Sequence, residues 1–398
     1  MGCLVTRSSG LVVIAPRPAV LALDSRFWQG RRVLLTGHTG FKGAWLALWL
    51  RQLGAEVQGV ALAPEGTPNL YQQLNLEDLS VLPGSLQSAL IDICELQPLA
   101  TTVQAFQPEV VFHLAAQPLV RRSYAEPLLT WQTNVMGTLN LFEALRSLRR
   151  PCAVLAITTD KVYRNQEWWY GYRETDALGG HDPYSASKAA AELLIDSWRS
   201  SFCGDLPHQT PWLAVASARA GNVIGGGDWA SDRIVPDAMR ACGAGEVLAL
   251  RHPDATRPWQ HVLEPLAGYL LLGQLLLQDL LGACDGTADS RFREAWNFGP
   301  ALESNRSVRD LVEALHTVWP GAWRDASDPS AVHEAGLLHL VTDKAHHQLG
   351  WRPRWDLTMT AERTAGWYRR VHEGASPLRC CVDDLEAYWQ SGGIPVPA

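Results

Sequence analysis

Short apolar runs and amphipathic stretches alternate along the first half of the chain. Six apolar runs of strand length lie at residues 32–37, 56–62, 88–93, 109–116, 152–158 and 212–218. Helical patterns lie between them, at residues 41–54, 100–106, 133–150 and 183–202. Strands that alternate with helices pair in parallel through right-handed crossovers. The pattern therefore predicts an α/β fold built on a Rossmann-type, doubly wound parallel sheet.

The pattern changes after about residue 220, where loops and short helices replace the regular alternation. No linker rich in Ser, Gly or Pro marks a boundary, which indicates two lobes that share an interface. We expect residues 27–220 to form the sheet domain, with a later segment at about 255–300 returning to it. Residues 221–398 are expected to form mainly a smaller, mixed α/β C-terminal lobe that binds the substrate.

Residues 1–26 fit neither part. A basic residue followed by an apolar run resembles a secretory signal peptide, and the first six residues match the loose pattern for myristoylation. Pro16 and Pro18 break the apolar run, which is also too short to span a bilayer. We interpret residues 1–26 as a disordered extension or the product of an upstream start site.

Composition excludes several classes of function. Hydrophobic residues make up 47% of the 398 residues and charged residues 19%, which is a globular profile. The net charge of −7, without a run of one sign, gives no nucleic-acid footprint. The eight Cys and twelve His have neither CxxC nor HExxH spacing, so we expect no metal site, no disulfide framework and a reducing, cytoplasmic location. The apolar stretch 269–282 has polar breaks and suits a buried helix better than a membrane span.

A glycine-rich turn joins the first strand to the first helix. The segment "TGHTGFKG" places Gly37, Gly40 and Gly43 there. Glycines at this junction allow a tight turn and let backbone N–H groups approach a pyrophosphate. The spacing is GxxGxxG rather than GxGxxG, but its position favours dinucleotide binding over an ordinary turn.

The usual partner of the adenosine ribose is missing. An acid is expected about 20 residues after the glycines, at the end of the second strand. That strand ends in apolar residues, with Glu65 the nearest acid and without an Arg to bind a 2′-phosphate, which favours NAD over NADP. Asp92, near the end of the third strand, is either an adenine contact or a loop cap.

Candidate catalytic residues follow the fifth strand and begin the next helix. Tyr184 and Lys188 are four residues apart after Pro183, so both side chains lie on one helix face. A nearby ammonium, with a nicotinamide cation, would lower the pKa of the phenol toward the working pH. Thr159, at the strand end, adds a hydroxyl. YxxxK alone occurs by chance, but its combination with the glycine turn is specific.

These features together resemble the extended short-chain dehydrogenase/reductases that act on nucleotide sugars. Within that family the resemblance is closest to the dehydratases of CDP-glucose. The motifs that carry it extend from about residue 27 to past residue 355, and include "GHTGFKGAW", "HLAAQPLVRRSY", "TTDKVY", "DPYSASKAAAEL", "RAGNVIGGGDWA", "RPWQHVLEPL", "WNFGP" and "LGWRPRW".

The resemblance implies an NAD-dependent lyase that makes a 4-keto-6-deoxy sugar from CDP-glucose or a related nucleotide sugar. Such an enzyme needs an acid to protonate the departing C6 hydroxyl, and Asp160 lies beside Thr159 for this role. Related dehydratases carry Glu where this chain has Lys161, whereas the CDP-glucose subgroup carries Lys. Removal of the C5 proton is therefore assigned to Asp160, to Lys161 or to both.

The resemblance also implies contact residues and an assembly. The expected cofactor contacts are Gly37, Thr39, Gly40, Phe41, Gly43, Asp92, Ile93, Ala115, Ala116, Gln117, Tyr184 and Lys188. The expected substrate contacts are Asn222, Arg233, Arg257 and His261. Trp168, Trp169 and Tyr172 are expected either to cover the substrate or to pack in the core. The family habit is a homo-oligomer, a dimer or tetramer. A 4-epimerase, a dehydratase of another nucleotide sugar, or a non-catalytic NAD-binding protein remain the alternatives.

Overall fold

A parallel sheet forms the centre of the protein. The computed structural model describes residues 23–204, 206, 209–283, 290–327 and 336–392. Seven strands pair in parallel in the order β11-β6-β5-β4-β1-β2-β3. Their bounds are β1 Arg32–Thr36, β2 Glu56–Ala61, β3 Ser85–Leu90, β4 Val110–His113, β5 Cys152–Ile157, β6 Leu213–Arg219 and β11 Ala295–Asn297. The strand order reverses between β1 and β4, and open sheets of this type bind ligands at the carboxyl ends of the strands at that point.

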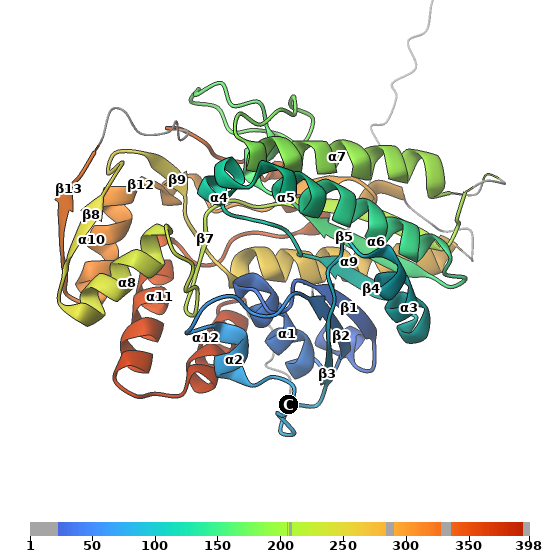
Figure 1. Ribbon diagram of the computed structural model, residues 1–398, viewed down its shortest axis with the longest axis horizontal. Helices are drawn as coiled ribbons and strands as arrows, with labels where there is room; N and C mark the ends of the chain where they lie inside the picture. Colours follow the sequence, from blue (N-terminus) through green and yellow to red (C-terminus); the bar gives the residue numbers. More distant parts are fainter. Residues whose placement is uncertain (1–22, 205, 207–208, 284–289, 328–335, 393–398) are drawn as a thin grey trace, which may run out of the picture.

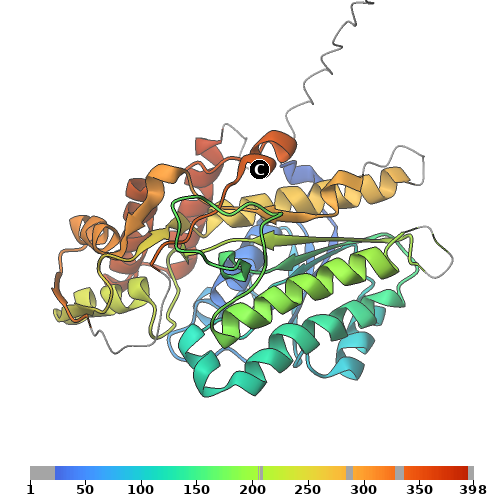
Figure 2. The same cartoon turned by 90° about the horizontal axis from the view of Figure 1, so that it is seen from above.

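Helices cover both faces of the sheet, and the strand residues alternate between two cores (Figures 1 and 2). Leu34 of β1 packs into the core beneath α3 (Leu96–Phe106), α6 (Gly137–Arg146) and α7 (Pro183–Phe202). Its neighbours Val33 and Leu35 point into the opposite core, with α1 (Phe41–Gln52) and α9 (Leu263–Ala283). Period-two alternation of buried residues on both faces explains why the strands read as continuous apolar runs.

The C-terminal elements gather beside the sheet, on the left of Figure 1. They are α8 Ile234–Ala244, β8 Val247–Leu250, α10 Val308–Val318, β13 Ala322–Asp325, α11 Leu357–His372 and α12 Pro377–Ser391. Two-stranded pairs connect this lobe to the sheet: β7 (Val223–Ile224) with β10 (Gln260–His261), and β9 (Thr256–Pro258) with β12 (Asn305–Ser307). Short helices α2 (Leu70–Leu74), α4 (Val120–Ala125) and α5 (Pro127–Trp131) complete the loops.

Glu264 fastens the lobe to the sheet domain. Its buried carboxylate accepts the N–H groups of Arg354 and Trp355 at 2.9 and 2.7 Å and the hydroxyl of Tyr388 at 2.7 Å. Burial raises the pKa of Glu264 to about 7 despite these bonds. The segments "RPWQHVLEPL" and "LGWRPRW" therefore contact each other directly, which gives a physical reason for finding both in one sequence.

The predicted fold class is confirmed. The six predicted strands are all present, and α9 and β11 both contact the sheet. The division of the chain into two domains stays a prediction. The third strand lies at 85–90 rather than 88–93, because Ile93 is buried against Gly137 from a loop and not from the strand. Among the described residues, no helix combines the length and apolar character that a membrane span needs.

Residues 23–26, which we assigned to an N-terminal extension, are part of the described fold. Residues 1–22 lie outside the described part of the chain. Leu23 is buried, the N–H of Asp24 donates to Oε1 of Gln274, and a 3-10 helix spans Ser25–Trp28. The fold therefore includes at least four of the residues that we assigned to the extension.

Candidate active site

The glycine turn leaves no room for a side chain at Gly37 or at Gly43. Gly37 has φ +77°, and a Cβ there would lie 2.7 Å from the backbone N of Ala115, across the switch point between β1 and β4. A Cβ on Gly43 would lie 2.1 Å from the carbonyl oxygen of Gly37. Helix α1 begins directly after Gly40, and no side chain caps its first N–H groups. A compact turn with uncapped N–H groups fits a pyrophosphate.

Several expected cofactor contacts have structural partners of their own. Thr39 Oγ1 donates to the carbonyl of Leu62 at 3.0 Å. Asp92 Oδ1 accepts the N–H of Cys94 at 2.9 Å, so this carboxylate serves as a loop cap, and its contact with adenine stays a prediction. The side chain of Gln117 bonds the backbone of Leu119 and the hydroxyl of Thr130 and shapes the loop after β4.

Two polar residues of the glycine turn were missed. The ring of His38 lies against Gly59 of β2, with Nε2 2.8 Å from Oγ of Ser88, and burial lowers its pKa to about 4. Lys42 has its pKa lowered to about 8, first by burial and then by the charges of Arg233 and Lys188. From the sequence we considered only the glycines of this turn. His38 and Lys42, at positions between the glycines, could have been noticed there.

Thr159 and Asp160 lie at the carboxyl end of β5, where the chain turns into a 3-10 helix (Asp160–Val162). Thr159 caps this turn, accepting the N–H of Lys161 at 3.3 Å and donating to Oδ1 of Asp160 at 3.0 Å. The Asp160 carboxyl is 1% exposed, and its Oδ2 has no hydrogen-bond partner. Burial raises the pKa of Asp160, opposed by Lys161, by the Thr159 bond, and by Arg257 and Lys42. This environment favours the protonated acid.

Gly221 makes room for that carboxyl. A Cβ at residue 221 would lie 1.7 Å from Oδ2 of Asp160. We therefore expect Gly221→Ala to displace the Asp160 carboxyl and lower kcat by about 100-fold, the scale of a misplaced catalytic group. Gly366→Ala is the matched control, because a Cβ there meets nothing within 4 Å. The measurement is kcat of both variants by steady-state kinetics, and equal kcat values for Gly221→Ala and Gly366→Ala would contradict the expectation.

Tyr184 and Lys188 lie at the start of α7. The Asp182 side chain caps this helix by accepting the N–H of Ser185 at 2.9 Å, and Pro183 is its first residue. Both predicted side chains are buried, and Lys188 Nζ donates to the carbonyl of Ile157 at the end of β5, at 3.1 Å. The helix therefore places its YxxxK face over the strand end that carries Thr159.

The expected lowering of the Tyr184 pKa by Lys188 is not found in the chain itself. Burial raises the pKa of Tyr184 to about 12, and only a hydrogen bond with Thr159 and the charge of Arg233 oppose this rise. Burial also lowers the pKa of Lys188 to about 8, which means that its ammonium loses its proton more readily than an exposed one. Of the two causes that we named, only the nicotinamide cation is left to bring the phenol toward working pH.

Three of the four expected substrate residues line the same region. Arg233 precedes α8 and donates to Asp228 at 2.9 Å. Its positive charge lowers the pKa of Tyr184. Arg257 on β9 bonds the carbonyls of Thr256 and Gly336 and lowers the pKa of Asp160. Asn222 has a left-handed backbone, φ 42°, directly after Gly221.

The fourth expected substrate residue, His261, lies deeper in the protein, and its contact with the substrate stays a prediction. It is fully buried, with its ring 6.1 Å from that of Trp45 and 4.8 Å from that of Trp355. Burial lowers its pKa to about 3, so the ring stays neutral. Its Nδ1 accepts the N–H of Leu263 at 3.3 Å, and its buried Nε2 has no hydrogen-bond partner within the described part of the chain.

The aromatic residues after the catalytic strand divide between core and surface. Tyr172 is buried and stacks on Tyr163 at 5.1 Å, and Trp168 stacks on Tyr172 at 5.6 Å. Trp169 is 84% exposed. Tyr172 therefore packs in the core, the second of its two expected roles.

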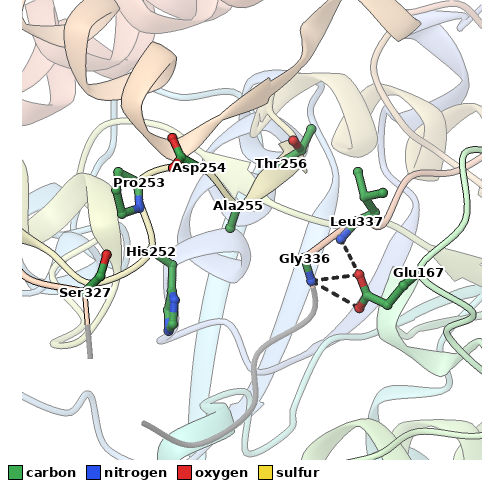
Figure 3. A pocket seen from close by; sticks show the side chains of 9 residues that line it. All are labelled: Glu167, His252, Pro253, Asp254, Ala255, Thr256, Ser327, Gly336 and Leu337. Carbon is green, nitrogen blue, oxygen red and sulfur yellow. Dashed lines mark hydrogen bonds between the residues drawn. The ribbon is translucent and has the colours of Figure 1, made fainter. Parts of the chain in front are cut away.

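A separate cavity of about 500 Å³ opens in the lobe (Figure 3). Its lining residues are Glu167, His252, Pro253, Asp254, Ala255, Thr256, Ser327, Gly336 and Leu337. The Glu167 carboxylate closes one wall by accepting the N–H groups of Gly336 and Leu337 at 3.0 and 2.7 Å. None of the predicted site residues lines this cavity.

Comparisons with known proteins agree with this geometry. The profile of the family described as GDP-mannose 4,6 dehydratase matches residues 34–364. The chain is 44% identical over 368 residues to the CDP-glucose 4,6-dehydratase of Salmonella typhimurium strain LT2, covering 92% of this chain and 98% of that protein.

Solved structures support the fold. The dTDP-glucose 4,6-dehydratase of Bacillus anthracis in complex with NAD superimposes with a TM-score of 0.70 at 18% identity, covering 88% of this chain and 100% of that one. The UDP-glucose 4-epimerase of Brucella ovis in complex with NAD gives a TM-score of 0.66 at 20% identity, covering 85% and 98%. With a glycine turn, a YxxxK helix and a buried acid at the end of β5, and with a family profile that matches most of its length, the chain belongs to the GDP-mannose 4,6 dehydratase family of nucleotide-sugar dehydratases.

Proposed function

We propose that the chain is an NAD-dependent 4,6-dehydratase that converts CDP-D-glucose to CDP-4-keto-6-deoxy-D-glucose and water, for deoxysugar and polysaccharide biosynthesis. One observation carries the reaction type: a buried, protonatable carboxyl at Asp160, with one oxygen lacking a partner, next to the Thr159–Tyr184 pair. Only a reaction that expels a hydroxyl needs an acid at this position. The 44% identity to a CDP-glucose 4,6-dehydratase carries the choice of nucleotide.

The residues present fit NAD as the cofactor. Gly37, Gly40 and Gly43 would hold its pyrophosphate at the start of α1, since any Cβ at Gly37 or Gly43 would collide with backbone. Asp92 and the ends of β2 and β3 would hold the adenosine, and Lys188 the nicotinamide ribose. When bound, NAD supplies the redox chemistry, accepting two electrons from sugar carbon 4 and returning them at carbon 6.

Tyr184 acts first, as the base that takes the proton of the sugar 4-hydroxyl, while Thr159 orients that hydroxyl. Burial makes the isolated phenol a poor acid, with a pKa of about 12. A cationic ring beside Tyr184 would favour the phenolate, because an opposite charge in a buried site lowers the pKa of an acid. Tyr184 is therefore expected to lose its proton when the cofactor is bound, and then to take the proton of the substrate's 4-hydroxyl.

Asp160 and Lys161 then carry out the elimination. The ketone at carbon 4 makes the C5 hydrogen acidic. Lys161, in its neutral form, takes that proton, and the resulting ammonium stabilises the enolate. Asp160 donates its own proton to the C6 hydroxyl, which departs as water. Burial raises the pKa of Asp160, which favours the protonated form that this step requires.

Arg233, Arg257 and Asn222 are assigned to the nucleotide diphosphate. Arg suits this role because its planar fork binds two phosphate oxygens at once. The charge of Arg233 lowers the pKa of Tyr184, and the charge of Arg257 lowers the pKa of Asp160, which supports placing both guanidinium groups beside the proposed catalytic residues.

The function is tested by incubating the purified protein and NAD with CDP-, dTDP-, GDP- and UDP-glucose or mannose, and assaying the base-induced chromophore of 4-keto-6-deoxy sugars. We expect the chromophore with CDP-glucose at a much higher rate than with the others. Activity restricted to a sugar of another nucleotide would overturn the substrate, and epimerisation without chromophore would overturn the reaction type.

We also propose that the protein acts as a homo-oligomer in the cytoplasm. Exposed apolar side chains gather on the helical segment from α4 through the π-helical turn (Gln132–Met136) into α6; they are Tyr124, Leu128, Leu129, Trp131 and Met136. A second copy would bury this surface. The six cysteines in the described part of the chain are free thiols, as a reducing compartment requires. Light scattering should give the mass of a dimer or tetramer, and a monomer at working concentration would contradict this.

A further inference from the structure

A third buried residue lies on the catalytic face of α7. Tyr184, Lys188 and Glu192 are spaced four apart, so all three side chains point from one face of the helix toward the sheet. Glu192 is 3% exposed. A carboxylate is rarely this deep in a protein without partners that offset the cost of removing it from water.

The Glu192 carboxylate bonds the ends of two strands. Its Oε1 accepts the hydroxyl of Thr158, at the end of β5, at 2.5 Å. Its Oε2 accepts the hydroxyl of Ser217 at 2.9 Å and Nη2 of Arg219 at 2.8 Å, both from β6. The two oxygens therefore differ: Oε2 has two donors from one strand, whereas Oε1 has Thr158 alone.

Arg219 extends the network into the core. Its Nη1 donates to the hydroxyl of Tyr163 at 2.8 Å and to the carbonyl of Glu174 at 3.0 Å. Tyr163 in turn donates to Oδ1 of Asn297 on β11 at 2.7 Å. The ion pair is almost completely excluded from water, and its position is fixed from β6, β11 and the loop after β5.

Thr158 directly precedes the catalytic pair. Thr159 and Asp160 follow it where the strand ends and the 3-10 turn begins, and beyond this point the sheet no longer holds the backbone. The N–H of Thr158 makes the last bond to β6, with the carbonyl of Ala218 at 2.9 Å. The Thr158 hydroxyl then joins this strand end to the helix that carries Tyr184.

We propose, on the basis of the function proposed above, that Glu192 is a positioning residue: through Thr158 it holds Thr159 and Asp160 at a fixed distance from Tyr184 on the same helix. The carboxylate touches no reacting atom. It joins the element that carries the acid to the element that carries the base. Because a displacement of about 1 Å can cost two orders of magnitude in rate, such a link matters for kcat more than for substrate binding.

The test removes one hydrogen bond at a time. Thr158→Val keeps the shape and loses the donor to Oε1. Ser217→Ala, the matched control, loses a donor to Oε2 that Arg219 still holds. We expect Thr158→Val to lower kcat by about tenfold to hundredfold, with KM for CDP-glucose within about threefold of wild type. Ser217→Ala is expected to keep kcat within about twofold, and Thr158→Ser, which retains the hydroxyl, to restore most of the activity.

The outcomes are distinct. Equal kcat values for Thr158→Val and Ser217→Ala overturn the positioning role and leave the proposed function standing. If Thr158→Ser lowers kcat as much as Thr158→Val does, the positioning role is also overturned, because loss of the hydroxyl is then not the cause of the lower kcat. Inactivity of the wild type on CDP-glucose overturns the proposed function and the inference with it. Thermal unfolding is measured for each variant, and if Thr158→Val does not fold, Thr158→Ala against Thr158→Ser gives the same contrast.

Discussion

Replacing Asp160 with asparagine is expected to lower turnover of CDP-glucose by about 100- to 10,000-fold, the range for loss of a general acid. Asparagine keeps the shape that Gly221 accommodates and can still accept the Thr159 hydroxyl, so the site should stay intact. The first oxidation at carbon 4 does not need the acid, whereas expulsion of the C6 hydroxyl does. The variant should therefore stall after oxidation, and the absorbance of reduced nicotinamide should accumulate in a rapid-mixing experiment.

The control is Asp196→Asn, which removes a carboxylate from an exposed position of the same helix α7. Its turnover should match wild type. Wild-type turnover in Asp160→Asn would remove Asp160 from the acid role. Loss of turnover without accumulation of reduced cofactor would show instead that Asp160 is needed for the oxidation.

Replacing Tyr184 with phenylalanine is expected to stop the reaction one step earlier. The ring would still fill its buried place, but nothing would take the proton of the 4-hydroxyl, so turnover should fall by about 100- to 10,000-fold. Mixing with CDP-glucose should give no rise in reduced nicotinamide. Tyr170→Phe, which removes a hydroxyl from a 73% exposed side chain, is the control. Normal cofactor reduction in Tyr184→Phe would contradict the assignment of the base.

The two variants together separate the half-reactions. Asp160→Asn should accumulate the oxidised sugar with reduced cofactor, and Tyr184→Phe should accumulate neither. A plain epimerase has no step that depends on the acid, so its Asp160 variant would not divide the reaction in this way.

The sheet was predictable because most of its strands (β1, β2, β4, β5 and β6) are buried on both faces. A strand such as β5, with six buried residues in succession, reads as an apolar run bounded by polar turns. The third strand shows the limit of this reasoning. Ile93 is as buried as a strand residue but lies in a loop, and an apolar run alone cannot tell the two apart.

The predicted catalytic residues lie close together in the structure because they follow one another closely along the chain. Thr159 and Asp160 end a strand, and the Tyr184–Lys188 pair lies on one turn of a helix, so local geometry brings each pair together. The surroundings of His261 could not be predicted, for the opposite reason. Its surroundings are set by Trp45 and Trp355, which are far from it in sequence, and no local pattern gives the direction of its side chain.

Glu192 illustrates an intermediate case. Its spacing of eight from Tyr184 was visible in the sequence and places it on the catalytic face, but its partners come from β5 and β6. The pKa of Tyr184 is similar, because the spacing of Lys188 suggests a lowering that burial outweighs. Long-range packing decides both, and only the folded chain supplies it.

The most direct test of the proposed dehydration is an isotope experiment with CDP-glucose that carries deuterium at carbon 4. After reaction with the protein and NAD, NMR of the product should show a 4-keto-6-deoxy sugar with the deuterium in the C6 methyl group, and with solvent hydrogen at carbon 5 when the reaction is repeated in heavy water. Deuterium that returns to carbon 4, or a product that keeps its C6 hydroxyl, would contradict the dehydratase assignment.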